Sequence, residues 1–315
     1  MSSARRRVVL DCDPGHDDAM AILLAAASPA IELEAITTVA GNQTVEKVTL
    51  NARRVCSVAG IRDVPIAAGC DRPLRREPII AGEIHGASGL DGVEWGEPTV
   101  DADPRHAVDV LIERAEADER PLTVVAVGPL TNVATALQRA PRIVDRLERI
   151  SIMGGAIGLG NWTPSAEFNI YADPEAAAAV FAAGVPITLV PLEVTHRALA
   201  TDEVLARIAA LDTPVARMSD ALMRFFADTY QRVFGFDAPA VHDPCAVAAI
   251  IDPTLVPTRL VNVAIDTGSE LSAGRTVCDV YGTTGRTPNA DVGVDLDVDR
   301  FWDLMLAALA AYPRL

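Results

Sequence analysis

Residues 8–27 read VVLDCDPGHDDAMAILLAAA. Val8 to Leu10 form a short apolar run rich in β-branched residues, which predicts a buried strand. The Pro14-Gly15 pair that follows predicts a sharp turn. From Asp17 to Ala27, apolar residues recur at the spacing of a helix. The stretch therefore predicts strand, loop and helix in succession, which is the first half of a parallel βα unit.

The same alternation continues along the chain. Further segments have the composition of buried strands, at residues 33–39, 122–127, 149–153 and 187–190. Segments with helical spacing lie between them, at residues 44–59, from residue 132, and at residues 174–183. Strands and helices that alternate in this way predict an α/β fold, whose central sheet is open, mostly parallel and Rossmann-like, with flanking helices.

The C-terminal third has a different pattern. Residues 201–234 predict two helices interrupted near Pro214, and residues 242–251 predict another. Residues 259–298 are rich in Val, Thr and Gly and contain turn signals, which predicts an additional region of antiparallel strands before a closing helix. No linker, repeat or low-complexity segment separates these parts, so we expect a single domain over residues 1–315.

Composition argues against several classes of protein. The chain has 27 basic and 43 acidic residues, a net charge of −16 and no basic run longer than Arg5-Arg6-Arg7, so nucleic acid is not an expected partner. No segment approaches the roughly 18 uninterrupted apolar residues of a membrane span, so no membrane partner is expected. The apolar run after Arg7 is too short for a signal peptide, and the five cysteines form no C-x-x-C pair. A reducing cytoplasm is therefore the expected location.

The first predicted loop concentrates negative charge, with Asp11, Asp13, Asp17 and Asp18 close together. Ligands of an open α/β sheet bind beyond the carboxyl ends of its strands, which makes this loop a candidate site. Carboxylates at this spacing repel one another unless a cation neutralises them, and oxygen ligands favour calcium or magnesium. One alternative is that the aspartates cap the following helix, which accounts for one or two of them. Another is a phosphatase whose first carboxylate is the nucleophile.

Three further loops carry polar motifs: Gly41-Asn42, the segment from Gly160 to Asn169, and His242-Asp243-Pro244. With D-x-D-P-G-x-D-D at residues 11–18 and H-D-P at residues 242–244, the sequence resembles the inosine-uridine type nucleoside hydrolases. The segments at residues 36–42, 128–132 and 166–169 match as well, so the resemblance covers almost the whole chain.

The resemblance implies a calcium ion held by Asp13, Asp18, Asp243 and the backbone carbonyl of Val127. It also implies hydrolysis of the N-glycosidic bond of ribonucleosides to ribose and free base, with a calcium-activated water as nucleophile and Asp13 as its general base. His242 is the candidate acid for the leaving base, since the pKa of histidine lies near working pH. The alternative for His242 is that it only caps the helix that it begins.

Other matching positions are expected to bind the sugar or the base: Asp17, Asn42, His85, Asn161, Glu167, Phe168, Asn169 and Tyr230. The rings of Phe168 and Tyr230 suit stacking against a nucleobase, although core packing explains Phe168 equally well. His16 has no assigned role, and Asp11 is a candidate anchor of the turn. Cys12 is expected to point into the core beside the strand and to be inert.

Two other functions are compatible with parts of the sequence. A magnesium phosphatase requires a downstream lysine, and the only lysine of the chain, Lys47, falls in a predicted helix. A nucleoside- or ribose-binding protein without turnover does not need the acid and base positions, which are occupied here. The resemblance implies a homo-oligomer, a dimer or tetramer. It leaves the base preference open, because His242 is typical of inosine-uridine and pyrimidine-preferring members, whereas Trp162 could stack on a purine.

Overall fold

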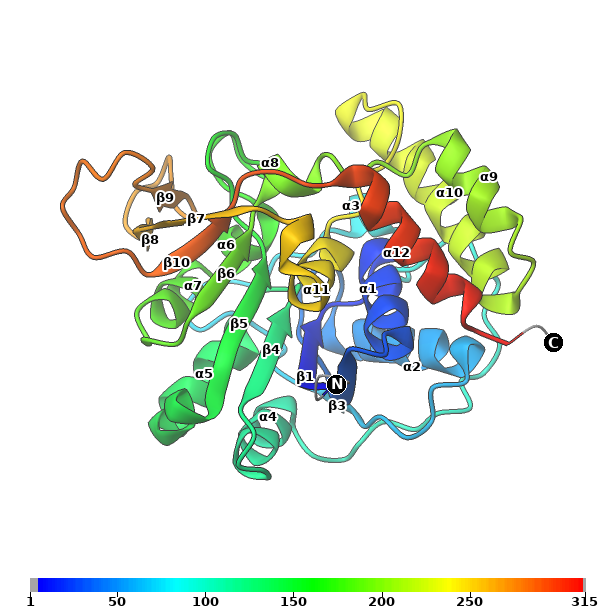
Figure 1. The fold of residues 1–315 in the computed structure, drawn as a ribbon, viewed down its shortest axis with the longest axis horizontal. Coiled ribbons are helices and arrows are strands. Elements are labelled where there is room, and N and C mark those ends of the chain that lie inside the picture. The colour runs from blue at the N-terminus through cyan, green and yellow to red at the C-terminus, as the bar shows by residue number, and fades with distance from the viewer. Residues whose placement is uncertain (1–4, 314–315) are drawn as a thin grey trace.

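The computed structural model describes residues 5–313. Its centre is an eight-stranded sheet with the order β3-β2-β1-β4-β5-β6-β10-β7 (Figure 1). In that order the strands span Ile66–Ala68, Ile31–Thr38, Arg6–Cys12, Leu122–Ala126, Leu147–Met153, Ile187–Val190, Ala290–Gly293 and Thr258–Val261. All neighbours are parallel except β10 and β7, so the predicted open and mostly parallel α/β sheet is confirmed.

Helices cover both faces of the sheet. One face packs against α1 (His16–Ala27), α2 (Val45–Ala59), α11 (Asp243–Ile251) and α12 (Val298–Ala310). The other face packs against α4 (Ala107–Glu116), α5 (Thr131–Arg139) and α7 (Pro174–Phe181). Side chains alternate between the faces, so Val8 and Leu10 of β1 join the first core and Val9 joins the second. Burial on both faces explains why β1 has an uninterrupted apolar sequence.

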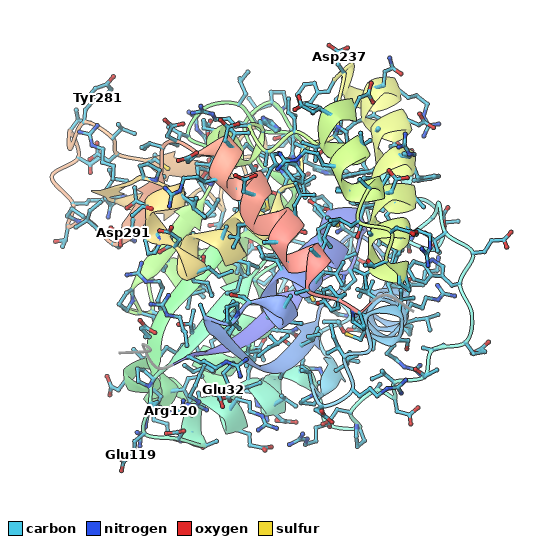
Figure 2. The ribbon with its side chains drawn as sticks, turned by 45° about the vertical axis from the view of Figure 1, so that its right-hand side comes forward. Glu32, Glu119, Arg120, Asp237, Tyr281 and Asp291 are labelled. Carbon is cyan, nitrogen blue, oxygen red and sulfur yellow. The ribbon has the colours of Figure 1, made fainter. Side chains whose placement is uncertain are left out.

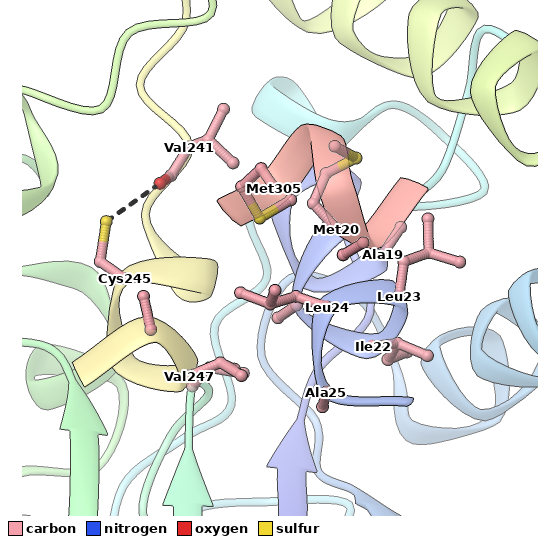
Figure 3. Packing of buried hydrophobic residues seen from close by; sticks show 14 of the residues in the cluster. Ala19, Met20, Ile22, Leu23, Leu24, Ala25, Val241, Cys245, Val247 and Met305 are labelled. Atoms are coloured by element: carbon pink, nitrogen blue, oxygen red, sulfur yellow. Dashed lines mark hydrogen bonds between the residues drawn. The ribbon is translucent and has the colours of Figure 1, made fainter. Parts of the chain in front are cut away.

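The core of the first face forms around α1, which packs against α11 and α12 (Figure 3). Met20 and Leu24 of α1, Val247 of α11 and Met305 of α12 belong to this cluster, and each is 0% exposed. The helix is apolar on nearly all sides because neighbouring elements surround it. This packing holds the N-terminus of α1, and with it the aspartate-rich loop, in place.

The C-terminal third completes the sheet and adds a helical pair. The two helices predicted for residues 201–234 are α9 (Asp202–Ala209) and α10 (Pro214–Phe234). The predicted antiparallel region is found in β8 (Val263–Ile265) with β9 (Thr276–Cys278), and in β7 with β10. However, β10 also runs parallel to β6, so this region extends the main sheet and is not antiparallel throughout. Tyr281, after β9, projects from the molecule (Figure 2).

Short helical segments lie near the carboxyl ends of the strands (Figure 1): α3 (Gly82–His85), α6 (Phe168–Ala172) and α8 (Leu192–Thr195). Two 3₁₀ turns span Pro141–Arg146 and Pro253–Leu255. Within residues 5–313, no helix combines the length and apolar character needed to cross a membrane.

Candidate active site

The carboxyl ends of the central strands bring distant loops together. The strand order reverses between β1 and β4, which is where open α/β sheets bind ligands. Asp13 follows β1, Asn42 follows β2, Val127 follows β4, and Asp243 begins α11. The predicted metal ligands therefore share one end of the sheet, although they come from distant parts of the sequence.

Three aspartates meet at this point. One carboxylate oxygen from each of Asp17, Asp18 and Asp243 lies within 4.8 Å of the others. All three residues are buried, and burial together with repulsion from Asp18 raises the pKa of Asp17 to about 8. Burial and neighbouring aspartates raise the pKa of Asp243 well above its usual value. The group includes Asp17, for which the sequence predicted a sugar contact.

Asp13 lies beside this group with one oxygen unpaired. Its Oδ2 accepts a hydrogen bond from the backbone N–H of Asn42 at 2.7 Å. Its Oδ1 is buried and has no hydrogen-bond partner among the described residues. A Cβ at Gly41 would lie 2.1 Å from Oδ2, and a Cβ at Gly128 would lie 2.6 Å from Oδ1. Glycine at these two positions therefore leaves the space that this carboxylate occupies.

The aspartate-rich loop wraps around Asp18. Its carboxylate accepts hydrogen bonds from the backbone N–H groups of Asp13 at 3.0 Å and Gly15 at 2.9 Å, and from the side chain of Asn42 at 3.1 Å. The bond from Gly15 caps α1, so the capping alternative is correct for this residue. Helix capping does not explain why the other aspartates of the loop are clustered there.

The opposite end of the sheet pairs its acidic side chains with arginines. Arg120 lies 3.0 Å from Glu32 on that surface (Figure 2), and Arg7 donates to Glu34. At the carboxyl end, by contrast, the described residues that line the cavity include neither lysine nor arginine. The atoms there that could ligate a metal ion are carboxylate and carbonyl oxygens, which fit a hard cation such as calcium or magnesium.

A cavity adjoins the acidic cluster. All the residues predicted to bind substrate line it: Asp17, Asn42, His85, Asn161, Glu167, Phe168, Asn169 and Tyr230. The structure adds apolar wall residues that the sequence did not single out: Ala81, Ile84, Met153, Phe226 and Phe234. Trp162 also lines the cavity, and its ring contacts the Phe168 ring edge-on with centroids 5.0 Å apart. The cavity thus suits a ligand with a flat apolar part and a hydroxyl-rich part.

Both ring nitrogens of His242 have partners. Its Nδ1 lies 2.7 Å from Oγ1 of Thr195, and its Nε2 lies 2.5 Å from the hydroxyl of Tyr230. The side chain makes no capping hydrogen bond to α11, so the capping alternative for His242 is wrong. Burial, together with nearby His196, lowers the pKa of His242 to about 3. His242 and Tyr230 both line the cavity, so the paired side chains face its interior.

Several predicted sugar contacts also support the backbone. Glu167 accepts hydrogen bonds from the backbone N–H groups of Gly155 and Asn169, both at 2.9 Å, and caps α6. Burial raises the pKa of Glu167 to about 7, while these hydrogen bonds lower it. The amide of Asn169 donates to the carbonyl of Val127 at 2.9 Å. Glu167 and Asn169 therefore hold the backbone around the cavity in place and also line the cavity.

Two residues of the aspartate-rich loop point away from the cluster. Asp11 was a candidate anchor of the turn, but its Oδ1 accepts hydrogen bonds from the Thr37 hydroxyl at 2.6 Å and the Asn132 amide at 2.8 Å. It therefore ties β1 to β2 and α5. Cys12 lies 3.6 Å from the carbonyl of Thr37, and burial raises its pKa well above the usual value, as expected of an inert thiol.

The lysine that a phosphatase needs is not at the cavity. Lys47 is exposed on α2 and donates to the carbonyl of Ala87 at 2.7 Å.

His16, which had no assigned role, is fully buried, and its ring stacks on the ring of His85. The sequence motif could not predict this contact, because His16 and His85 are far apart in the sequence and meet only in the folded chain.

Known proteins resemble this chain along nearly its whole length. Residues 8–303 match the family described as inosine-uridine preferring nucleoside hydrolase. The pyrimidine-specific ribonucleoside hydrolase RihA of Shewanella woodyi is 45% identical over 311 residues, which cover 98% of this chain and 99% of that protein. The pyrimidine-specific ribonucleoside hydrolase RihB of Escherichia coli is 42% identical over 308 residues, or 98% of each.

A solved structure extends the likeness to the fold. The purine-preferring ribonucleoside hydrolase from Gardnerella vaginalis matches with a TM-score of 0.90 and 32% identity, over 97% of this chain and 98% of that one. These similarities favour a ribonucleoside hydrolase over a phosphatase or a binding protein without turnover. The chain belongs to the inosine-uridine preferring nucleoside hydrolase family and is a ribonucleoside hydrolase.

Proposed function

We propose that the chain hydrolyses the N-glycosidic bond of ribonucleosides with the help of calcium, and that it prefers pyrimidine nucleosides. The observation that supports this best is the buried, unpaired Oδ1 of Asp13 next to the clustered carboxylates, beside a cavity of suitable shape. The pyrimidine-specific relatives are 45% and 42% identical to the chain, whereas the purine-preferring structure is 32% identical, which supports the base preference.

Asp13, Asp18, Asp243 and the carbonyl of Val127 would hold the calcium ion. These oxygen donors suit calcium, and the carbonyl of Val127 keeps a lone pair beside the one that accepts from Asn169. When bound, calcium lowers the pKa of water and attracts the ribose hydroxyls.

Asp13 acts as the general base in this proposal. The backbone N–H of Asn42 holds its Oδ2, which leaves Oδ1 to take a proton from the attacking water. The water oxygen bonds to C1′ of the ribose while the C1′–N bond breaks and its electron pair leaves with the base. The surrounding carboxylates stabilise the positive charge that develops on the sugar, and a single displacement inverts the anomeric carbon.

The leaving base takes a proton from the pair formed by Tyr230 and His242. Both side chains line the cavity, and Nε2 of the imidazole is paired with the Tyr230 hydroxyl, so in this proposal the hydroxyl is the group that donates to the base. His242, held on its other side by Thr195, orients that hydroxyl and shares its proton. Aromatic walls at Phe168 and Phe226 offer flat surfaces to the base.

Release of reducing sugar from uridine, cytidine, inosine and adenosine tests the proposal. We expect faster release from uridine and cytidine, loss of activity on chelation, and recovery when calcium is added. Activity that survives complete chelation would contradict the calcium requirement. Absence of sugar release from all four nucleosides would contradict the reaction, and faster release from inosine and adenosine would contradict the base preference.

We also infer that the chain forms one domain, resides in the cytoplasm and assembles as a homo-oligomer, a dimer or tetramer. All five cysteines are unpaired, which suits a reducing compartment. Leu260, Leu271 and Tyr281 are 61%, 89% and 88% exposed, and large exposed apolar side chains often mark contact surfaces. Sedimentation equilibrium measures the subunit number, and a monomer at micromolar concentration would contradict the oligomer.

A further inference from the structure

Two histidines from different segments stack beside the cavity. His85, at the end of α3, lines the cavity, and His16, the first residue of α1, lies behind it with ring centroids 5.3 Å apart. His16 is 0% exposed, and its ring also stacks on Phe225 and Phe226 at 5.3 and 5.0 Å. Among residues 5–313, the polar contacts of the His16 ring are those that its two nitrogens make within this apolar stack.

The partners of those nitrogens determine where the protons lie. Nε2 of His16 lies 2.8 Å from the carbonyl oxygen of Asp91, and its Nδ1 lies 3.0 Å from Nδ1 of His85. A carbonyl oxygen only accepts, so Nε2 of His16 carries a proton. A neutral imidazole has one N–H, so Nδ1 of His16 accepts, and the proton between the rings belongs to His85. Nε2 of His85 is then left with a lone pair.

The surroundings favour neutral rings. Both rings are buried, and both stack on Phe226, so the charged imidazolium form is disfavoured. The backbone N–H of His16 lies 3.4 Å from Nδ1 of His85 and competes for the same atom. If that longer contact were satisfied instead, two lone pairs would face each other between the rings.

We propose that His16 is a positioning residue that holds His85 in its Nδ1-protonated tautomer, so that Nε2 of His85 accepts a hydrogen bond from an O–H or N–H group of the bound nucleoside. Nε2 of His85 has no hydrogen-bond partner among residues 5–313, and His85 lines the cavity. The inference rests on the proposed function, because it places a nucleoside in that cavity. It makes this part of the site selective for ligand groups that donate.

Nitrogen NMR of the histidine rings tests the tautomer without any measurement of turnover. Two-bond ¹H–¹⁵N correlations on ¹⁵N-histidine protein with calcium present distinguish the two neutral tautomers, and His85→Asn assigns the His85 signals. We expect a protonated Nδ1 and an unprotonated Nε2 at His85. A protonated Nε2 at His85 in the wild-type protein would overturn the proposal, whether or not the enzyme is active.

Two substitutions separate positioning from packing. His16→Asn places a carbonyl oxygen near the former Nδ1 and keeps an acceptor for His85, whereas His16→Gln places an amide near the former Nε2 and removes that acceptor. In His16→Gln the backbone N–H of residue 16 becomes the remaining partner of His85 Nδ1, so His85 should change to the Nε2-protonated tautomer. The same tautomer in wild type and His16→Gln would overturn the proposal.

Kinetics on uridine supply the functional readout. We expect kcat/KM to fall about tenfold in His16→Gln, mainly through KM, and to stay within about threefold of wild type in His16→Asn. His106→Asn is the control for loss of a histidine, because His106 caps α4 and asparagine also caps helices. Equal losses in both His16 variants would overturn the positioning role. If His16→Gln does not fold, the wild-type spectrum and His16→Asn still decide the question.

Discussion

Nε2 of His242 lies 2.5 Å from the hydroxyl oxygen of Tyr230. The second ring nitrogen of His242 is held by Thr195, so the imidazole has no free nitrogen to offer a ligand. Tyr230 lines the cavity and is 4% exposed. The two side chains are therefore paired at the cavity wall, and in the proposed mechanism the tyrosine hydroxyl passes the proton to the nucleobase.

Tyr230→Phe keeps the aromatic wall and removes only the hydroxyl. We expect kcat on uridine to fall about 100-fold, which is typical for loss of a general acid. A riboside of p-nitrophenol should be hydrolysed nearly as fast as by the wild type, since p-nitrophenolate leaves without protonation. Steady-state kinetics on both substrates measure the difference, and Tyr281→Phe on the exposed loop is the matched control. Equal losses on both substrates would indicate that Tyr230 acts through packing.

Asp13→Asn should abolish both calcium binding and turnover, with a loss in kcat of about 1000-fold or more, because one carboxylate serves as ligand and as general base. Asp11→Asn is the matched substitution in the same loop. The oxygen of asparagine can still accept from Thr37 and Asn132, so this variant should bind calcium about as tightly as the wild type. Isothermal titration with calcium gives both affinities, and similar affinities for Asp13→Asn and the wild type would remove Asp13 from the ligand set.

Calcium should stabilise the folded protein, because the ion neutralises carboxylates that otherwise repel one another in a buried site. At 100 times the dissociation constant, binding adds about 2.7 kcal/mol to the free energy of unfolding. Thermal unfolding with calcium and with chelator measures this effect. Asp243→Asn should lose most of the response, whereas Asp237→Asn, on the surface, should keep it (Figure 2). A wild-type melting temperature that does not respond to calcium would argue against the site.

Glu167 should make stability depend on pH. Its pKa is raised from 4.5 to about 7 in the folded protein, chiefly by burial, so the folded state favours the protonated acid. The resulting stabilisation is complete below pH 4.5 and is lost as pH rises through 7. By linkage, the free energy of unfolding of the wild type should fall by about 3 kcal/mol relative to Glu167→Gln over this interval. Urea denaturation of both proteins at pH 5 to 8, at saturating calcium, measures the difference. Parallel pH profiles would show that Glu167 is ionised throughout.

The inner strands of the sheet were predictable because each is buried on both faces and therefore has a continuous apolar sequence. That applies to β1, β4, β5 and β6. The short strand β3 was not predicted, and β10 was predicted only as part of an antiparallel region, since three or four residues carry too little pattern and depend on a neighbouring strand for pairing. Helix α4 was also missed, although its apolar residues follow helical spacing after the cap at His106.

The sequence by itself determined the chemistry of the ligands. The crowded carboxylates at residues 11–18, without a lysine or arginine among them, favour a bound cation because like charges close together repel one another. Only the tertiary structure decided which groups meet. It brings Asp243 and Asp17 together, turns Asp11 towards Thr37, and pairs Tyr230 with His242 at the cavity wall. Side-chain direction and burial depend on how α1, α10 and α11 pack around the ends of the strands, and sequence spacing does not specify that packing.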